Sequence, residues 1–436
     1  MKANSLINFI EKSPSAFHVI KNIENELIDN GFKQLLEFQN WELEENGKYF
    51  VTKNNSSIIA FVVNSKNYNA FNIVSSHSDS PTFKIKENAE ITVNESYLKL
   101  NTEPYGGAIL STWMDRPLSI AGRVFVNENG QTVQKLLNID RDLLVIPNLA
   151  IHMDRTVNES KNFNPQIDTL PLLSGSVDKG QLLTTICDEL NIKQTDFLAS
   201  DLYLYSRAKG TTVGLNNEFI VSPKLDDLEC VYSSLQGFLK SNHNNISTIP
   251  VYAVFDNEEV GSSSKQGALS TFMADVFKRI NISLGHNEEH FFTSLAQSFM
   301  LSADNAHGLH PNYTTHSDPT NAPILNKGIV IKHNANQAYT TDGVSNALLK
   351  TLLKNKNIPF QSFTNRSNIK GGSTLGNLLN HSISINTVDI GAAQLAMHSS
   401  CETAGTKDLE YMYQTFIEFY STSFGEQVIQ SILYRQ

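Results

Sequence analysis

The sequence predicts an α/β fold in which one layered α/β domain is split by a β-rich insertion. Helix-like and strand-like runs alternate over residues 1–86, as they do in layered α/β domains. Between residues 87 and 220, short alternating runs separated by turn residues take over. Helix and strand then alternate again over residues 221–436, and a chain of 436 residues is long enough for two or three domains.

The first part opens on a predicted helix that starts after Ser15 and ends at Gly31. Serine is a residue type that caps helix N-termini, and glycine is favoured directly after a helix. The apolar residues between them recur at helical spacing: Phe17, Ile20, Ile23 and Leu27. Three runs rich in β-branched and aromatic residues follow and are predicted strands, over residues 49–52, 57–63 and 71–76.

The insertion is predicted to hold a single clear helix, over residues 181–190. Its strand-like runs include AEITVNESYLKLN (89–101), LSIAGRVFV (118–126) and DLLVIPN (142–148). In the last part, predicted helices cover residues 228–240, 268–284, 289–300, 344–354 and a long segment from 408 onward. Predicted strands there cover residues 250–255, 328–333 and 385–390.

Composition excludes several classes of protein. Lysine and arginine number 34 against 44 aspartates and glutamates, a net charge of −10, and no polybasic run occurs, so we expect no nucleic-acid and no membrane partner. The three cysteines are far apart, which argues against a disulfide framework or a thiolate zinc site and favours a reducing compartment. The N-terminus lacks the apolar core of a secretory signal, so we expect a cytoplasmic protein.

Acidic and imidazole side chains stand where apolar strand-like runs end: His77, Asp226, Glu258, Glu259, Asp304 and His398. In open α/β sheets, residues beyond the carboxyl ends of strands converge on one crevice. A cluster of His, Asp and Glu without Cys suits a hydrolytic divalent-metal site, with zinc as the first choice and manganese or cobalt as substitutes. Taken singly, each residue has an ordinary explanation, such as a helix cap or a solvated loop, and it is the joint pattern that favours a metal site.

Eight segments carry a family resemblance. They are SHSDSPTFKIK (76–86), EPYGGAILSTWMDRPLSIAGRV (103–124), IPNLAIHMDR (146–155), SPKLDDLEC (222–230), DNEEVGSSSKQGA (256–268), SADNAHGLHPNY (302–313), GGSTLG (371–376) and QLAMHS (394–399). In this order they resemble the signature blocks of the aspartyl aminopeptidase family, metallopeptidase family 18, which includes vacuolar aminopeptidase I. The resemblance implies a zinc-aminopeptidase-like α/β/α catalytic domain, over residues 1–86 and 221–436, with a β-rich inserted dimerisation domain over residues 87–220.

The resemblance also implies a centre of two divalent metal ions per subunit. Asp226 would bridge both ions, His77 and Asp304 would complete one site, and Glu259 and His398 would complete the other. Glu258 would be the general base. The chain departs from many members at Asp227, where they have asparagine, and the extra carboxylate there is expected to alter metal affinity without abolishing the site.

Three further residues are candidates with an ordinary alternative beside each. Asp79 is placed to accept the imidazole N–H of His77 that a metal leaves free, or else to form a turn before Ser80. Lys332 is a candidate partner for an acidic first residue of the substrate, or else a solvated surface lysine. His152 in the insertion, otherwise a surface histidine, corresponds in similar proteins to a residue that crosses the dimer interface and helps bind substrate.

The leading functional hypothesis is a dinuclear aminopeptidase that hydrolyses an N-terminal residue, with Asp or Glu as a possible preference, from peptide substrates through a metal-bridging water activated by Glu258. The alternatives are a related dinuclear metallo-amidase or carboxypeptidase, and a non-catalytic assembly protein of the same fold. The resemblance further implies a homo-oligomer, a tetrahedral dodecamer of dimers, with the inserted domain as the candidate dimer surface.

Overall fold

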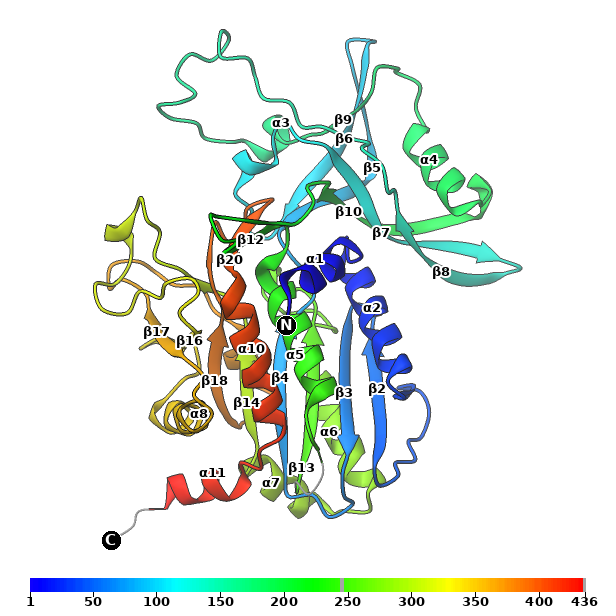
Figure 1. The fold of residues 1–436 in the computed structure, drawn as a ribbon. Coiled ribbons are helices and arrows are strands. Elements are labelled where there is room, and N and C mark those ends of the chain that lie inside the picture. The colour runs from blue at the N-terminus through cyan, green and yellow to red at the C-terminus, as the bar shows by residue number, and fades with distance from the viewer. Residues whose placement is uncertain (244–246, 434–436) are drawn as a thin grey trace.

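The computed structural model describes residues 1–243 and 247–433 and contains three sheets, two of them large. Figure 1 shows a large α/β unit below and a second, β-rich unit above it. The predicted fold class, α/β with a β-rich insertion, is confirmed. No helix among the described residues is long and apolar enough to cross a membrane.

The large unit is built on a nine-stranded sheet of order β1-β2-β3-β13-β4-β14-β18-β16-β17. Its strands are β1 Lys33–Gln34, β2 Gly47–Lys53, β3 Ser57–Val63, β4 Ala70–His77, β13 Thr248–Phe255, β14 Phe299–Ala303, β16 Ile329–His333, β17 Phe360–Thr364 and β18 Asn386–Gly391. The four central strands β13, β4, β14 and β18 run parallel to one another, so their carboxyl ends meet at one edge.

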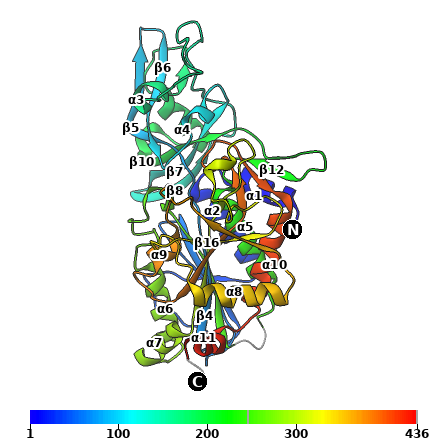
Figure 2. The same cartoon turned by 90° about the vertical axis from the view of Figure 1, so that its left-hand side faces the viewer.

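Helices cover both faces of this sheet, which makes the unit an α/β/α sandwich. One face is covered by α1 Ala3–Glu11, α2 Ala16–Asp29, α5 Leu225–Lys240, α8 Gly343–Asn355, α10 Thr406–Tyr420 and α11 Gly425–Ile432. The other is covered by α6 Phe272–Ser283, α7 Glu288–Ala296 and α9 Leu375–Leu379. Figure 2 shows α6, α7 and α9 on one side and α5, α8 and α10 on the other.

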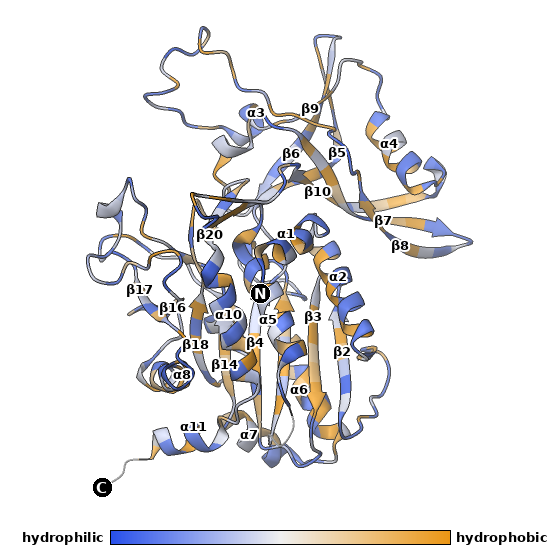
Figure 3. Ribbon diagram, in the orientation of Figure 1, coloured by the Kyte–Doolittle hydropathy of each residue, from blue (hydrophilic) through white to orange (hydrophobic). Residues whose placement is uncertain are grey.

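Alternation along each central strand explains why two helical layers are needed. In β13, Tyr252 and Val254 belong to one apolar core, while Val251 and Ala253 belong to the other. All eight residues of β13 and all eight of β4 are buried. The central strands are accordingly mostly orange in the hydropathy colouring of Figure 3, as expected for strands buried on both faces.

The second unit is a six-stranded antiparallel sheet of order β8-β7-β10-β5-β6-β9 with an apolar core of its own. Its elements are β5 Thr82–Val93, β6 Tyr97–Tyr105, η1 Leu110–Trp113, β7 Leu118–Glu128, β8 Gln131–Asn138, α3 Pro165–Asp168, β9 Leu172–Ser174, α4 Gln181–Leu190, η2 Gln194–Asp196 and β10 Phe197–Ser206. The first strand of the sheet starts at Thr82, ahead of the predicted boundary at residue 87. The predicted helix over residues 181–190 is α4.

A small five-stranded sheet joins distant parts of the chain in the order β11-β12-β20-β19-β15. Its strands are β11 Thr211–Val213, β12 Phe219–Ser222, β15 Ala306–His307, β19 Ala393–Leu395 and β20 Glu402–Gly405, and two short helices, η3 Glu258–Val260 and η4 Thr314–His316, lie in neighbouring loops. In Figure 1 it lies where the two larger units meet.

Three local predictions differ from the structure. The strand-like run DLLVIPN (142–148) forms no strand and makes only isolated bridges, at Leu144 and Val145. The helix predicted over residues 289–300 ends earlier, because α7 stops at Ala296 and β14 begins at Phe299. An apolar run buried on both sides has no strand periodicity and is therefore indistinguishable from a continuing helix. Ser15 does precede α2, but its hydroxyl lies 2.8 Å from Nδ1 of His18 and makes no capping bond.

Candidate metal centre

Four of the six predicted residues lie at the carboxyl edge of the nine-stranded sheet. His77 is the last residue of β4, and Glu258 and Glu259 form the start of η3 just after β13. Asp304 directly follows β14. Because β13, β4 and β14 are parallel neighbours, these side chains leave the sheet together.

Asp226 and His398 arrive from the five-stranded sheet instead. Asp226 follows β12 at the start of α5, and His398 follows β19. Strand β20 pairs with both β12 and β19, which brings the two loops together. The expectation that all the ligands stand on one open sheet is therefore wrong, because the second sheet is needed to complete the cluster.

The side chains converge around Asp226, whose two carboxylate oxygens face two different imidazoles. Oδ1 of Asp226 lies 3.3 Å from Nε2 of His77, and Oδ2 lies 3.3 Å from Nε2 of His398. Nε2 of His77 is also 3.9 Å from Oδ1 of Asp304, and Nε2 of His398 is 3.4 Å from Oε2 of Glu259. Asp226 thus lies between two pairs of candidate ligands, His77 with Asp304 and His398 with Glu259.

These separations fit divalent metal ions. Ligand atoms about 2.0–2.2 Å from a tetrahedral zinc ion lie about 3.3–3.6 Å from one another. Oδ1 of Asp226 and Oε1 of Glu259 are buried and have no hydrogen-bond partner among the described residues, as expected for atoms reserved for a cation. Three overlapping groups of side chains have ligand atoms within 4.8 Å of one another, and Asp226 belongs to two of them.

The electrostatics of the cluster favour added positive charge. Burial, with Asp226 as the next largest cause, raises the pKa of Glu259 well above its usual range. Burial opposes the charged form of His77 as well, but the surrounding carboxylates, Asp226 first, raise the pKa of that imidazole. Burial likewise opposes the charged form of His398, and Asp226 outweighs it to raise the pKa of His398 to about 9. Closely spaced, buried carboxylates of this kind are stabilised by cations held between them.

Asp79 holds the loop of the predicted general base. Its carboxylate accepts the backbone N–H groups of Glu258 and Glu259, each at 3.1 Å, and the hydroxyl of Tyr105 at 2.8 Å. The backbone carbonyl of Asp79, rather than its carboxylate, is the nearest partner of His77 Nδ1, at 3.1 Å against 3.5 Å. Asp79 thereby connects His77 to the two glutamates.

Glycine is required where strand β18 passes the Asp304 loop. A Cβ atom on Gly391 would lie 2.0 Å from the carbonyl oxygen of Asp304. Any larger residue at position 391 would clash with the backbone of Asp304. Because no flexible side chain can turn away to relieve the clash, the whole Asp304 loop would have to shift.

Lys332 and His152 lie in very different surroundings. Lys332 is 2 % exposed, and its Nζ donates to Oδ2 of Asp304 and to the carbonyl oxygen of Asn305, both at 3.2 Å. The alternative of a solvated surface lysine is therefore wrong. His152 is exposed in the long loop between β8 and α3, and among residues 1–243 and 247–433 no hydrogen bond or ion pair connects it to the cluster.

Two further buried acids lie near the cluster: Asp227, expected from the sequence to alter metal affinity, and Glu402, which the sequence did not indicate. Asp227 accepts the backbone N–H of His77 at 3.2 Å, and its other oxygen has no hydrogen-bond partner among the described residues. Glu402 accepts the backbone N–H groups of Asp226 and His398. For Asp227 the signal was its place next to Asp226, whereas nothing in the local pattern distinguishes Glu402 from a surface glutamate.

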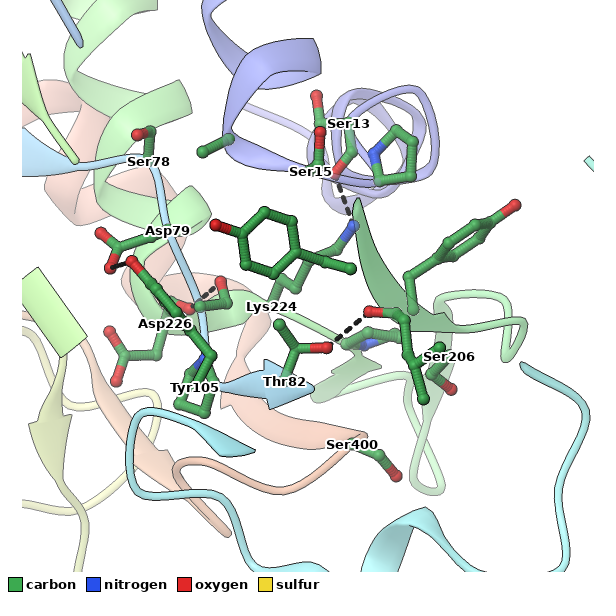
Figure 4. Close-up of a pocket in the computed structure, with 18 of the residues that line it drawn as sticks. Ser13, Ser15, Ser78, Asp79, Thr82, Tyr105, Ser206, Lys224, Asp226 and Ser400 are labelled. Carbon is green, nitrogen blue, oxygen red and sulfur yellow. Dashed lines mark hydrogen bonds between the residues drawn. The ribbon is translucent and has the colours of Figure 1, made fainter. Parts of the chain in front are cut away.

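A cavity of about 60 Å³ lies behind the cluster, between the α/β unit and the β-rich unit. Figure 4 shows Asp79, Asp226 and Tyr105 on one side of it and Ser13, Ser206 and Lys224 on the other. Nζ of Lys224 donates to the carbonyl oxygen of Ser13, which ties the start of α5 to the loop before α2. Asp226 itself lines this cavity, so the cavity adjoins the cluster.

Two curated relatives match almost the whole chain. The "Probable M18 family aminopeptidase 2" of Clostridium acetobutylicum is 48% identical over 427 residues, 96% of this chain and 98% of that protein. "Aspartyl aminopeptidase 1" of Schizosaccharomyces pombe is 38% identical over 447 residues, 96% of this chain and 94% of that protein. The similarity therefore extends over the α/β unit and the β-rich unit together.

Solved structures match equally broadly. The chain in "Cryo-EM structure of the Ape4 and Nbr1 complex" superposes with a TM-score of 0.95 at 37% identity, covering 99% of this chain and 87% of that one. The chain in the structure of the Saccharomyces cerevisiae mApe1 dodecamer superposes with a TM-score of 0.86 at 26% identity, covering 98% of each chain. The model of the family described as "Aminopeptidase I zinc metalloprotease (M18)" matches residues 9–420. The chain therefore belongs to the M18 family of aminopeptidases and is a metallo-aminopeptidase.

Proposed function

We propose that this chain is a dinuclear metal-dependent aminopeptidase that removes acidic N-terminal residues from peptides. The observation that carries the proposal is the placing of Asp226, whose two oxygens face His77 and His398 separately. A carboxylate shared in this way is suited to hold two ions side by side, with Asp304 completing one ligand group and Glu259 the other. Two bound divalent cations would supply Lewis acidity, which activates water and polarises the scissile carbonyl.

Glu258 is the residue we assign to proton transfer. It precedes Glu259 in η3 and shares a candidate ligand group with His77, so it lies beside the reacting centre. Burial raises the pKa of Glu258 to about 8, and His77 works against that rise. A carboxylate with a pKa near neutrality can accept the proton of the attacking water and return it to the leaving amine.

The acidic preference is supported by Lys332 and by the relatives. Two of the three ammonium donors of Lys332 contact Asp304 and Asn305, which leaves one donor for a substrate carboxylate. The relative from Schizosaccharomyces pombe is named an aspartyl aminopeptidase. The third donor would then meet the side chain of the first substrate residue.

We further propose that the chain assembles as a homo-oligomer, a dodecamer built from dimers, since the similar mApe1 chain of Saccharomyces cerevisiae forms a dodecamer. The loop that carries His152 also exposes apolar side chains that suit a contact with a second copy: Leu149, Ile151 and Met153. His152 would reach the substrate of the partner subunit.

The test combines metal content with substrate choice. We expect purified protein to hold two divalent ions per chain by elemental analysis, and to release Asp and Glu from free N-termini but not from N-acetylated peptides. Glu258→Gln should keep both ions and lose about 10²–10⁴-fold in kcat, the usual contribution of a positioned general base. Cleavage of blocked peptides would indicate an amidase or carboxypeptidase, and folded protein with neither metal nor activity would indicate an assembly role.

A further inference from the structure

Glu402 joins the two loops that come from the five-stranded sheet. Its side chain is buried, and the two oxygens of its carboxylate have different partners. Oε2 accepts the backbone N–H of Asp226 at 2.9 Å, and Oε1 accepts the backbone N–H of His398 at 2.7 Å. The Glu402 carboxylate therefore holds the backbone of Asp226, whose side chain faces both imidazoles, and the backbone of His398, which carries one of those imidazoles.

The sheet explains why Glu402 is placed to do this. It is the first residue of β20 and lies opposite Ser222, the last residue of β12. The neighbouring residue of β20, Thr403, lies opposite Leu395, the last residue of β19. The Asp226 loop therefore leaves the sheet from β12, on one side of Glu402, and the His398 loop leaves it from β19, on the other side.

The backbone before Glu402 needs such a restraint. His398 has a φ of +67° and Ala396 a φ of +55°, both in the left-handed region that favours glycine. A residue other than glycine in that region is strained and persists only where surrounding contacts fix it. The bond from His398 N–H to Glu402 is one such contact, and it is aimed at the residue whose ring must meet a metal.

We propose that Glu402 is a positioning residue that fixes Asp226 and His398 for metal binding, and thereby sets the affinity of the ion held by His398 and Glu259. The inference rests on the proposed dinuclear function. Among the described residues, the Glu402 side chain makes no hydrogen bond or ion pair with the side chain of a proposed ligand; it acts through two backbone N–H groups. Outer groups that orient metal ligands typically contribute 10–100-fold to metal affinity.

The test is a zinc titration of metal-stripped protein against a chromogenic chelator, with wild type, Glu402→Gln and a control. The glutamine keeps one acceptor oxygen but turns an NH₂ group toward the other N–H, so one of the two bonds is lost. We expect the zinc affinity of the site beside His398 and Glu259 to fall about 10–100-fold, seen as a fall in one of the two fitted affinities, and kcat at limiting zinc to fall with it and recover in excess zinc. Recovery by added zinc would not follow from a general loss of structure.

Asp408 provides the matched control. It is also a buried carboxylate that accepts two backbone N–H groups, those of Asn326 and Gly328, but it belongs to α10, and in the described part of the chain it makes no hydrogen bond or ion pair with the cluster. Asp408→Asn should lower the melting temperature and leave both zinc affinities unchanged. If Glu402→Gln behaves in the same way, with both affinities within twofold of wild type, Glu402 is structural and the inference is overturned.

A shortened side chain keeps the test decisive if the glutamine variant does not fold. Glu402→Asp retains the charge but withdraws the carboxylate by one methylene group, and the same titration with the same criteria applies to it. If wild-type protein binds two zinc ions and the Glu402 variants bind them with unchanged affinity, only the proposed role of Glu402 is overturned. Wild-type protein that binds fewer than two ions overturns the dinuclear proposal itself and this inference with it.

Discussion

The carboxylate of Asp79 accepts the backbone N–H of Glu258 at 3.1 Å, so the predicted general base is held by a residue two positions beyond the His77 ligand. The same carboxylate accepts the N–H of Glu259 and the hydroxyl of Tyr105. All three partners are donors. An acid is therefore required at position 79, since either orientation of an amide would turn an NH₂ group toward a donor.

We expect Asp79→Asn to lower kcat about 10–100-fold and to weaken the ion proposed beside Glu259, because the variant displaces the η3 backbone that carries both Glu258 and Glu259. Steady-state kinetics with elemental analysis measures this. Tyr105→Phe is the control, since it removes only one of the three donors and should cost much less. An unchanged kcat in Asp79→Asn would reduce Asp79 to a turn residue.

Asp227 adds a buried carboxylate next to the proposed site of the ion between His77 and Asp304. Asp227→Asn keeps an oxygen for the N–H of His77 and removes the charge, so we expect affinity for that ion to fall about 10–100-fold. Metal-stripped Asp227→Asn should melt at a higher temperature than stripped wild type, because burying an uncompensated charge destabilises the fold. Chelator competition and thermal melts measure the two effects. Equal affinity in the two proteins would contradict a role in metal binding.

The structural contacts of Lys332, to Asp304 and Asn305, can be separated by experiment from its proposed contact with a substrate carboxylate. Lys332→Met keeps the aliphatic stem, and we expect it to slow cleavage of every peptide through the displacement of Asp304. Peptides that begin with Asp or Glu should lose a further 10–100-fold in kcat/KM, since their carboxylate is left without a charged partner. Equal losses on Asp- and Leu-starting peptides would leave Lys332 with its structural role alone.

If His152 serves the partner's site, two inactive variants should restore each other. A subunit with His152→Ala still has Glu258, and a subunit with Glu258→Gln can supply His152 to it. Co-expression of the two should give about a quarter of wild-type activity after random pairing in a symmetric dimer. Mixed oligomers as inactive as either parent would contradict the exchange.

His18 makes stability depend on pH. Burial, with the charge of Lys224 as a second cause, lowers the pKa of His18 to about 4, below the 6.5 of an unfolded histidine. The folded state therefore binds the His18 proton less readily, and the contribution of His18 to the free energy of unfolding should fall as the pH drops from about 6.5 to about 4. His18→Gln keeps an acceptor near Ser15 and should flatten this slope in metal-stripped protein, measured by urea unfolding. Identical slopes would contradict the assignment.

The sequence predicted most of this structure where a pattern is local. The spacing from Phe17 to Leu27 predicted α2, and the ends of apolar runs predicted His77, Glu258, Glu259 and Asp304. Contacts between distant segments could not be predicted in this way. Nothing near Glu402 indicates that β20 pairs with β12, and the burial of Lys332 depends on Asp304 from another strand. Strand β14 could not be told from a helix in the sequence, because burial on both faces removes the alternation of polar and apolar residues.

The proposed ligands come from segments that are far apart in the sequence. His77 lies on β4, whose parallel partner β13 begins at Thr248, and His398 and Glu402 come later still. During synthesis the N-terminal segments emerge and fold first, and pairing of such distant segments is slow. A nascent chain lacks one proposed ligand until residue 398 has been made, so a chain truncated before that residue should not assemble the complete centre.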